Sequence, residues 1–299
     1  MNKFNFLITI LLLFIIIKSP AQDKLPDLKA EGLKGKVKSV KTKSYDAKEQ
    51  SGTFVKSNLD VGEGRYVYNQ KGKMVEKSYY RADGSLYSIE IYKYNDNGCL
   101  SEYKKVENNE IKENYTCKCD EKSNVIEKIE SVDLIGTTTI KYNDKGNVIE
   151  EFTDFHDGSP FRVTYKYDEK GNNIENNMNN DIITTNKYDL TGNRIESSNR
   201  YGYSIYKYDA KGNQIETSSY KNGALVYKCK DKYDATGNII ESVCYNSDGS
   251  LRSGTTFHKF VYDNFNNWIK KTSYTETSSF GVKGISNPQI EERKIEYYL

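Results

Sequence analysis

The sequence predicts an all-β protein: an antiparallel meander of about 20 strands, built from hairpin repeats and curled into a cylinder, a cage wall or a spiral. Three observations predict this fold. An eleven-residue unit, YKYDAKGNQIE at 206–216, recurs with small changes at 140–150, 165–175 and 231–241. Tyrosine alternates with lysine before each turn, with the period of two that is typical of a strand. Each repeat also carries two turn signals, so it holds two strands.

The first turn of each repeat has Asp or Asn, two free positions and then Gly. Asp suits the first place of a type I turn, and Gly suits the left-handed position that follows. Aligned on this glycine, the copies are 20 to 29 residues apart, with Ser123 and Asn266 in the glycine place of the third and ninth copies. In the most regular copies the predicted turn residues are Asp168, Gly171, Asp189, Gly192, Asp209, Gly212, Asp234 and Gly237.

A second strand follows each first turn, with an aliphatic residue and then a glutamate, as in Ile215-Glu216. It runs into a second turn, marked by hairpin dipeptides such as Asp83-Gly84 and Asn222-Gly223. Nine repeats and both ends of the chain give about 20 strands, and an open twisted sheet of that size rarely stays flat. We therefore expect the sheet to curl.

The register of each hairpin depends on its turn. With a two-residue loop, Tyr206 faces Ile215 and the sheet has one apolar side. With Gly212 as a bulge in a three-residue loop, Tyr206 faces Glu216 and Ile215 faces Lys207, so both faces are mixed. The Asp-x-x-Gly pattern favours the bulged form, and a slip of one residue exchanges the faces of a strand.

The start of the chain predicts export. Residues 1–21 have an early lysine, a 12-residue apolar run and a small-x-small site, which is the pattern of a cleaved secretory signal peptide. The apolar run is shorter than the roughly 20 residues needed to span a bilayer. We expect a mature chain without an integral membrane segment, located in the periplasm, on the cell surface or outside a bacterial cell.

The repeat array is predicted to span residues 66–271. Residues 22–65 form a polar lead-in and a degenerate first hairpin. Residues 272–299 are predicted to be a capping segment, including a loose stretch from Glu276 to Gln289, because terminal repeats have one side without a neighbour. Trp268, the only tryptophan, is assigned to this cap.

Composition limits the classes of partner. Tyrosine supplies 26 residues, against 11 Phe, and its ring buries apolar area while its hydroxyl needs water or a partner. That suits a thin sheet with half-exposed faces. The chain has 44 basic and 42 acidic residues, and the two extra bases, Lys3 and Lys18, lie in the predicted leader. Nucleic-acid binders carry clustered, unbalanced Lys and Arg, so we expect no nucleic-acid partner.

Five cysteines in an exported protein predict disulfides, with one cysteine left over. Cys229 and Cys244 lie on the two arms of one hairpin and could pair across its strands. Cys99 could pair with Cys117 or Cys119, although neighbouring turns on the same side of a sheet are two strands, roughly 9.6 Å, apart.

The sequence contains no strong catalytic or cofactor motif. The 2 histidines, His156 and His258, belong to distant repeats, and there is no Gly-x-Ser-x-Gly elbow. The recurring Glu is explained as a cross-strand partner of the recurring Lys, and the turn Asp as a cap of its own turn rather than a Ca²⁺ ligand. We predict no catalytic, metal-binding or cofactor-binding residue, and hence no enzyme.

The units YKYDEKGNNIE, NKYDLTGNRIE, YKYDAKGNQIE and DKYDATGNIIE resemble the YD repeat of the Rhs family, whose core reads Tyr-x-Tyr-Asp-x-x-Gly-Asn/Arg. The resemblance covers Tyr66 to Lys271 and implies an extracytoplasmic shell of β-strands, which in large members encloses a C-terminal toxin. This chain lacks the Asp-Pro-rich boundary and the toxin segment, so it is more similar to small secreted bacterial proteins made of such repeats alone. Its Asp-Gly turns also resemble the MORN-type repeats of YwqK-like proteins.

We therefore predict a secreted, non-enzymatic scaffold that binds a protein or glycan partner. Rows of tyrosine on the sheet can stack on sugar rings or accept a partner's side chains, or they can pack on one another. The alternative is a toxin-system component, either a shell around a separate effector or a YwqK-like neutraliser. A closed interior would favour the shell, and an open or filled sheet would favour the scaffold.

Overall fold

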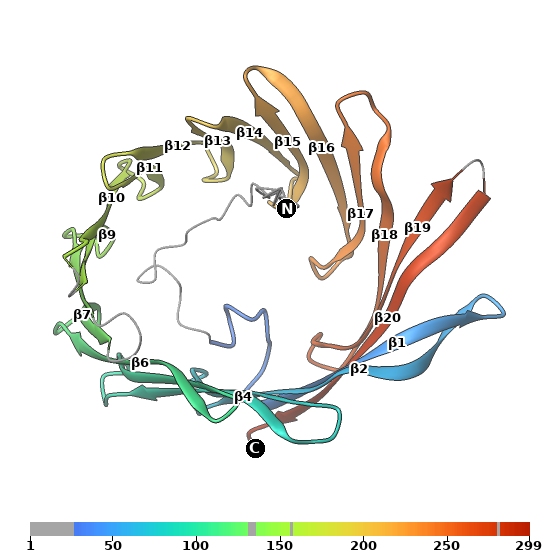
Figure 1. Cartoon of the computed structure of the whole chain (residues 1–299), viewed down its shortest axis with the longest axis horizontal. Coiled ribbons are helices and arrows are strands. Elements are labelled where there is room, and N and C mark those ends of the chain that lie inside the picture. The colour runs from blue at the N-terminus through green and yellow to red at the C-terminus, as the bar shows by residue number, and fades with distance from the viewer. Residues whose placement is uncertain (1–26, 131–135, 156–157, 280–281) are drawn as a thin grey trace, which may run out of the picture.

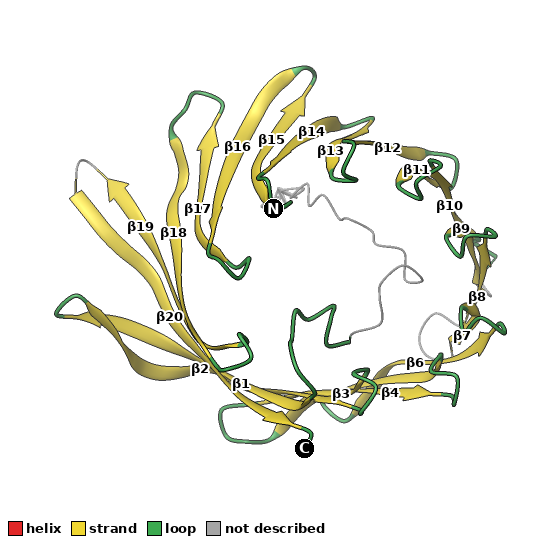
Figure 2. Cartoon of the chain, turned by 180° about the vertical axis from the view of Figure 1, so that it is seen from behind, coloured by secondary structure: helices red, strands yellow, loops and turns green. Residues whose placement is uncertain are grey.

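The computed structural model describes residues 27–130, 136–155, 158–279 and 282–299, and these residues form twenty β-strands and no helix. Each strand pairs in antiparallel fashion with the next, and β20 pairs with β1. A single sheet therefore closes into a cylinder (Figures 1 and 2). The predicted all-β meander, curled into a cylinder, is confirmed. The predicted signal peptide lies outside the described residues.

The strands around the closure are long and those opposite are short. β1, β2 and β20 have 14 to 16 residues, whereas β10 to β14 have 6 or 7. The strands are β1 (Val37–Gln50), β2 (Thr53–Tyr68), β3 (Met74–Tyr80), β4 (Leu86–Tyr94), β5 (Leu100–Glu107), β6 (Glu110–Cys119), β7 (Val125–Glu130), β8 (Gly136–Tyr142), β9 (Val148–Phe155), β10 (Phe161–Tyr167), β11 (Asn173–Met178), β12 (Ile182–Tyr188), β13 (Arg194–Asn199), β14 (Gly202–Tyr208), β15 (Gln214–Lys221), β16 (Ala224–Tyr233), β17 (Ile239–Asn246), β18 (Leu251–Tyr262), β19 (Trp268–Ser279) and β20 (Val282–Tyr297).

The first turns of all the repeats lie on one rim of the cylinder, which we call the repeat-turn rim. In each, the turn residue after two free positions is left-handed, as at Gly212 with φ 84°. The Gly212 amide donates to the Asp209 carbonyl at 3.0 Å, and the Asp209 amide donates to the Asn213 carbonyl at 2.9 Å. This is the predicted type I turn with a three-residue loop, and Ser123 and Asn266 adopt the same left-handed conformation.

The predicted register is correct for only the first pair beyond each turn. Tyr208 faces Gln214, but a second bulge then shifts the strand, so that Lys207 faces Glu216 and Tyr206 faces Thr217. Both predicted registers for Tyr206 are therefore wrong. The same shift follows the turn in the eight other repeats. In seven of the nine repeats it brings the recurring lysine and glutamate directly opposite each other on one face.

The tyrosine-bearing face lines the inside of the cylinder. The lead-in, residues 27–36, lies inside the ring in both views (Figures 1 and 2). Its Leu28 and Leu33 pack against a buried cluster that includes Tyr68 and Met74. Because side chains alternate along a strand, the tyrosines that flank each lysine share this inner face, and the lysines point outward.

The two ends of the repeat array meet at the closure, where the lead-in is held by the last turn. Asn267 is only 3% exposed. Its Oδ1 accepts a hydrogen bond from the Lys34 amide at 2.8 Å, and its Nδ2 donates to the Lys34 carbonyl at 2.8 Å. At the other end of the lead-in, the Leu28 amide donates to the Gly72 carbonyl at 3.0 Å. The lead-in thus bridges the last and first repeat turns.

The C-terminal segment closes the sheet. The predicted loose stretch is wrong for the described residues, because Glu276 lies in β19 and Gln289 in β20. This segment is rich in serine and threonine, so its sequence lacks the alternation of apolar and polar residues that would predict a strand. Trp268 begins β19, with the Arg293 guanidinium 3.4 Å from the centre of its ring. Its strand, β19, pairs with β18 on one side and β20 on the other, because a closed sheet has no terminal repeat that needs a cap.

Replacing Asn267 by alanine is expected to lower the free energy of unfolding by about 1–3 kcal/mol, because both backbone groups of Lys34 lose their partner in a part-buried place. Asn213→Ala is the matched control. Asn213 holds the same position in its repeat, but its Nδ2 bonds only Asp209 of its own turn. Urea unfolding followed by circular dichroism measures both variants. Equal losses in the two variants would show that the hydrogen bonds between Asn267 and the Lys34 backbone add no stability.

Candidate functional site on the inner wall

The turn aspartates cap their own turns. Asp209 Oδ1 accepts from the amides of Lys211 and Asn213, both at 2.9 Å, and its Oδ2 accepts from Asn213 Nδ2. At Asp189, hydrogen bonds led by the Thr191 hydroxyl lower the pKa to about 2. The predicted turn residues all lie on the repeat-turn rim, at Asp168, Gly171, Asp189, Gly192, Asp209, Gly212, Asp234 and Gly237.

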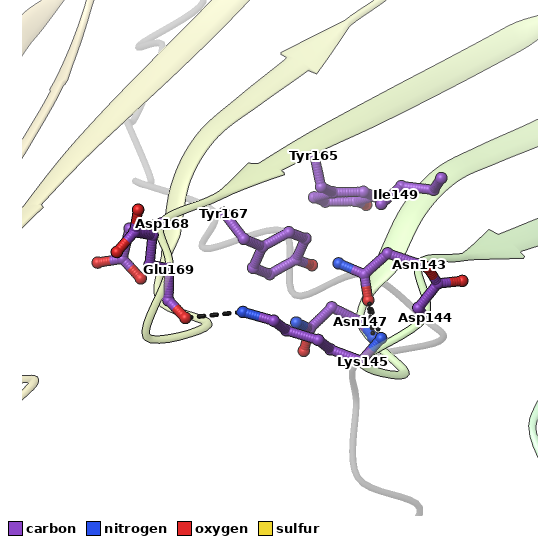
Figure 3. A pocket seen from close by; sticks show the side chains of 9 residues that line it. All are labelled: Asn143, Asp144, Lys145, Asn147, Ile149, Tyr165, Tyr167, Asp168 and Glu169. Atoms are coloured by element: carbon purple, nitrogen blue, oxygen red, sulfur yellow. Dashed lines mark hydrogen bonds between the residues drawn. The ribbon is translucent and has the colours of Figure 1, made fainter.

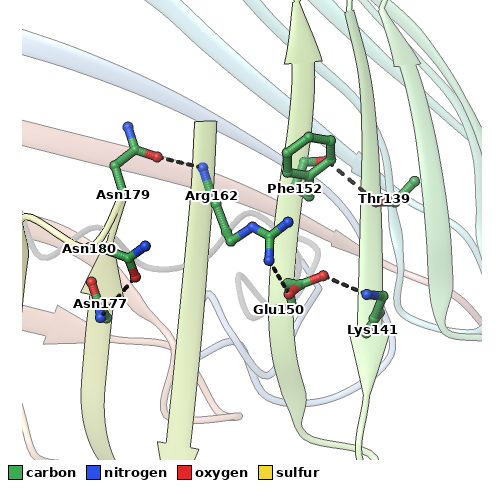
Figure 4. Close-up of polar contacts among 8 residues, drawn as sticks. All are labelled: Thr139, Lys141, Glu150, Phe152, Arg162, Asn177, Asn179 and Asn180. Atoms are coloured by element: carbon green, nitrogen blue, oxygen red, sulfur yellow. Dashed lines mark hydrogen bonds and ion pairs between the residues drawn. The ribbon is translucent and has the colours of Figure 1, made fainter. Parts of the chain in front are cut away.

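The recurring glutamates pair with the recurring lysines on the outer face. In the Lys141 pair, Nζ lies 2.6 Å from Glu150 Oε1, and Arg162 joins from the next strand at 3.2 Å (Figure 4). Exposed pairs of this kind contribute about 0.2–1 kcal/mol each, so they support register more than stability. The seven equivalent pairs are Lys93–Glu102, Lys118–Glu127, Lys141–Glu150, Lys166–Glu175, Lys187–Glu196, Lys207–Glu216 and Lys232–Glu241.

The second tyrosine of each Tyr-x-Tyr joins its repeat to the previous one. Tyr208 donates its hydroxyl to the Arg194 carbonyl at 2.8 Å, and Tyr142 donates to the Val125 carbonyl at 2.8 Å. Burial raises the pKa of Tyr142 to about 12. The same bond recurs at Tyr94, Tyr167, Tyr188 and Tyr233. These hydroxyls are committed to the wall and are not available to a partner.

Tyr208→Phe is expected to lower the free energy of unfolding by about 0.5–1.5 kcal/mol, because it deletes the hydroxyl and leaves the Arg194 carbonyl without this donor. Tyr206→Phe, two residues earlier on the same face, is expected to change it by less than about 0.5 kcal/mol. Chemical denaturation of both variants makes the comparison. The assignment fails if the two variants are equally destabilised.

Two disulfides join neighbouring strands of the array. Cys229 and Cys244 face each other across β16 and β17 and are bonded, with their Cα atoms 4.0 Å apart. Cys99 is bonded to Cys119, with a Cα separation of 6.5 Å. The predicted 9.6 Å spacing was too large for this pair, because adjoining arms of consecutive turns are only one strand apart. Cys117 is the free cysteine among the described residues.

Cys119 stands where other repeats have the second tyrosine, and its Sγ lies 3.6 Å from the Leu100 carbonyl that such a tyrosine would bond. Cys99 stands where seven of the other eight repeats have asparagine after the turn. The bond therefore takes the place of the tyrosine link in this one repeat.

The inner wall of β3 to β7 carries aromatic and charged side chains in alternation. The rings of Tyr92 and Tyr103 are centred 5.1 Å apart, and those of Tyr103 and Tyr115 are stacked at 4.8 Å. Lys128 Nζ lies 3.9 Å from the centre of the Tyr115 ring. Tyr92 and Tyr103 are buried against their neighbours, so in this stretch the tyrosines pack on one another, and Tyr115 is half-buried between Tyr103 and Lys128.

The inner charges are paired with each other. Lys77 bonds Glu90 at 3.2 Å, which in turn accepts from the Tyr92 hydroxyl at 2.6 Å. We call this set the charged lattice: Lys77, Glu90, Lys105, Glu107, Glu113, Lys128 and Glu130. This lattice was not predicted, although lysine and glutamate at inner positions beside tyrosine were its signal in the sequence.

Two open hollows lie at equivalent places on the repeat-turn rim, each between one turn and the Tyr-x-Tyr strand of the next repeat. The first, of about 380 Å³, is lined by Ile149, Tyr165 and Tyr167, and Lys145 closes one side by bonding the Glu169 carbonyl at 2.8 Å (Figure 3). The second, of about 690 Å³, is lined by Ile195 and Tyr206 among others. Each offers an apolar floor with polar turn groups around it.

No cluster of three or more histidine, cysteine or acidic side chains suited to a metal is found within the described parts of the chain. His258 lies there, with Nδ1 2.8 Å from the Ser273 hydroxyl, whereas His156 lies outside them. None of the described residues forms a helix able to cross a membrane.

No family model matches the chain, and no curated protein matches it. Among solved structures, it is similar to TcdB2-TccC3 without its hypervariable C-terminal region, at 12% identity and a TM-score of 0.41, over 83% of this chain and 15% of that one. A porin-like protein from Bacteroides uniformis matches at 10% identity and a TM-score of 0.38, over 87% and 96% of the two chains. The Tc holotoxin pore of Photorhabdus luminescens matches at 12% and 0.31, over 79% and 16%. TM-scores this low carry no argument about function.

Proposed function

We propose that the chain is an exported, non-enzymatic scaffold of the YD-repeat (Rhs) type that holds an elongated protein or glycan partner inside its cylinder. The observation that carries the proposal is the closed sheet whose inner wall presents tyrosine rings and apolar hollows. Aromatic rings offer a large apolar area with a polar tip, which suits both sugar rings and polypeptide side chains. The outer wall, by contrast, is covered by self-paired Lys and Glu.

The size of the interior favours an elongated partner. Twenty strands about 4.8 Å apart give a perimeter of about 96 Å and a backbone diameter of about 30 Å, or about 40 Å with tilted strands. Inner side chains remove about 5 Å on each side, which leaves about 20–30 Å, and the lead-in on the inner wall narrows this further at the closure. A helix needs about 10–12 Å, whereas a domain of about 100 residues, with a radius of gyration near 13 Å, is about 33 Å across.

The same estimate bears on the shell alternative. A closed interior is what a shell around an effector requires, and the sheet is closed. The interior is nevertheless narrower than a folded domain of about 100 residues, so a shell of this size would hold an effector only as an extended or helical segment. The predicted signal peptide argues against a cytoplasmic YwqK-like neutraliser.

A pull-down and glycan-array screen with residues 22–299 tests the proposal. The wild-type protein is expected to retain a polypeptide or a glycan. Replacing the inner Tyr115 by alanine is expected to weaken binding at least tenfold, whereas Tyr203→Ala on the outer face should leave it within twofold. Binding lost equally in both variants would contradict an inner site, and turnover of a small molecule would contradict a scaffold without enzymatic activity.

A further inference from the structure

The inner wall has two chemically different halves. Between β3 and β7 it carries the charged lattice, whose ions pair with one another. Between β11 and β15 most polar side chains at inner positions are uncharged amides and hydroxyls, and the cation among them, Arg194, lies 5.0 Å from the centre of the Tyr206 ring (Figures 1 and 2 show these strands on the arc across from the closure). We call these side chains the neutral row: Asn176, Thr184, Asn186, Ser197, Ser204 and Ser219.

The neutral row is continuous across the sheet. Asn176 faces Thr184, and one step along β12 Asn186 faces Ser197. Ser197 faces Ser204, which faces Ser219 on the next strand. The row ends on an aromatic side chain at both sides, because Asn176 also faces Tyr165, and Ser219 faces Tyr227. From β10 to β16 it spans six strand spacings, or about 29 Å.

The amides of this row are not satisfied by their neighbours. Asn186 is only 8% exposed, and its Nδ2 donates to the Asn173 carbonyl at 3.1 Å, but its Oδ1 has no partner. The adjacent Asn173 Nδ2 and Asn176 Oδ1 are also without a partner. A buried polar atom left unpaired costs about 1–3 kcal/mol. The charged lattice on the opposite half shows no such deficit among its described side chains.

A hollow adjoins the row at the repeat-turn rim. It has a volume of about 690 Å³, and Ile195 and Tyr206, which line it, come from the two strands that carry Ser197 and Ser204. The hollow supplies an apolar surface for a ring, while the row supplies donors and acceptors without net charge. Sugar hydroxyls both donate and accept, so they can satisfy free amide NH₂ and C=O groups together.

Resting on the proposed function, we propose that the partner is a neutral oligosaccharide that lies along the neutral row from β10 to β16, with one sugar ring in the hollow at Tyr206. The six side chains of the row carry no charge, and the neighbouring inner cation, Arg194, lies over the Tyr206 ring rather than in the row. The unpaired Oδ1 atoms of Asn176 and Asn186 in the row, with the unpaired Nδ2 of the adjacent Asn173, supply both acceptors and a donor, which match a chain of hydroxyls.

Affinity electrophoresis with laminarin, mannan and dextran tests this inference, with heparin as the charged probe. The folded wild-type protein is expected to be retarded by at least one neutral polysaccharide and not by heparin. Asn186→Ser and Asn176→Ser are expected to weaken that retardation at least tenfold. Thermal unfolding should show both variants folded, because the unpaired Oδ1 makes no bond and Asn186→Ser gives up only the Nδ2 contacts with Asn173.

Asn177→Ser is the matched control. Asn177 lies on the same strand and also has an unpaired Oδ1, but it points to the outer face (Figure 4). It should leave retardation within twofold. Retardation by no neutral polysaccharide, or equal loss in the inner and outer variants, would overturn the inference. If a polypeptide is then captured in a way that depends on Tyr115, the proposed function stands with a different partner; if nothing is captured, both fail.

Discussion

Raising the pH from 10 to 12 is expected to unfold the cylinder cooperatively. Burial raises the pKa of Tyr94 and of Tyr142 to about 12, and it also raises the pKa of Tyr208 and Tyr233. Because the folded pKa exceeds the ordinary value of 10.0, the contribution of these groups is complete below pH 10. It is lost as the pH rises toward 12, since the unfolded chain then releases these protons more readily.

Two signals followed in one titration check this expectation. Tyrosinate absorbance and far-ultraviolet circular dichroism should change together, because ionising the linking hydroxyls removes the donors that join consecutive repeats. Tyr142→Phe deletes one such group and should make the alkaline loss of stability shallower, whereas Tyr87→Phe, at an exposed site, should not. Full ionisation with an intact sheet signal would contradict the role given to these hydroxyls.

Removing the Cys99–Cys119 disulfide by replacing both residues with serine is expected to lower the free energy of unfolding by about 3 kcal/mol. The bond closes a loop with a sequence separation of 20 residues, and cross-links of that length restrict the unfolded chain by about this amount. Cys117→Ser, two residues away, removes no bond and should change stability by less than about 0.5 kcal/mol. Guanidinium unfolding under oxidising conditions measures both.

A second double variant, Cys99→Asn with Cys119→Tyr, tests why the disulfide is there. It gives these two places, in consecutive repeats, the residues that most other repeats have there. The introduced hydroxyl can donate to the Leu100 carbonyl, as Tyr142 does to Val125, so about 0.5–1.5 kcal/mol of the loss should return. Stability no better than that of the double serine variant would show that the two links are not interchangeable.

The hairpin repeat was predictable because each of its local signals points to the same structure. The Asp209 turn, the alternation around Lys207 and the count of strands follow from residue chemistry at short range. The position of the second bulge cannot be predicted from the sequence. Nothing in the local sequence says whether Ile215 pairs with a residue of the facing strand or is left unpaired as a bulge. The same shift occurs between Val67 and Tyr68 and between Val261 and Tyr262, where no lysine faces a glutamate, so the Lys207–Glu216 pair alone does not set it.

Features that join distant parts of the chain could not be predicted from the sequence. The closure pairs Val40 with Ile295, and nothing local in either segment specifies the other. The hydrogen bonds between the Asn267 side chain and the Lys34 backbone likewise depend on the geometry of the closed sheet. The neutral row was missed for a different reason. Serine and asparagine are ordinary turn and surface residues, and only the register across β11 to β15 brings them into line.

The antiparallel contact between β1 and β20 has an arithmetic consequence. Strand direction alternates along the chain, so the last strand can meet the first in antiparallel fashion only when their number is even. Homologous chains can therefore gain or lose whole repeats, but not single strands, without breaking the ring. Each added repeat lengthens the perimeter by about 9.6 Å and widens the bore by about 3 Å. Gene duplication within the array would thus tune the diameter of the bore in steps of a few ångströms.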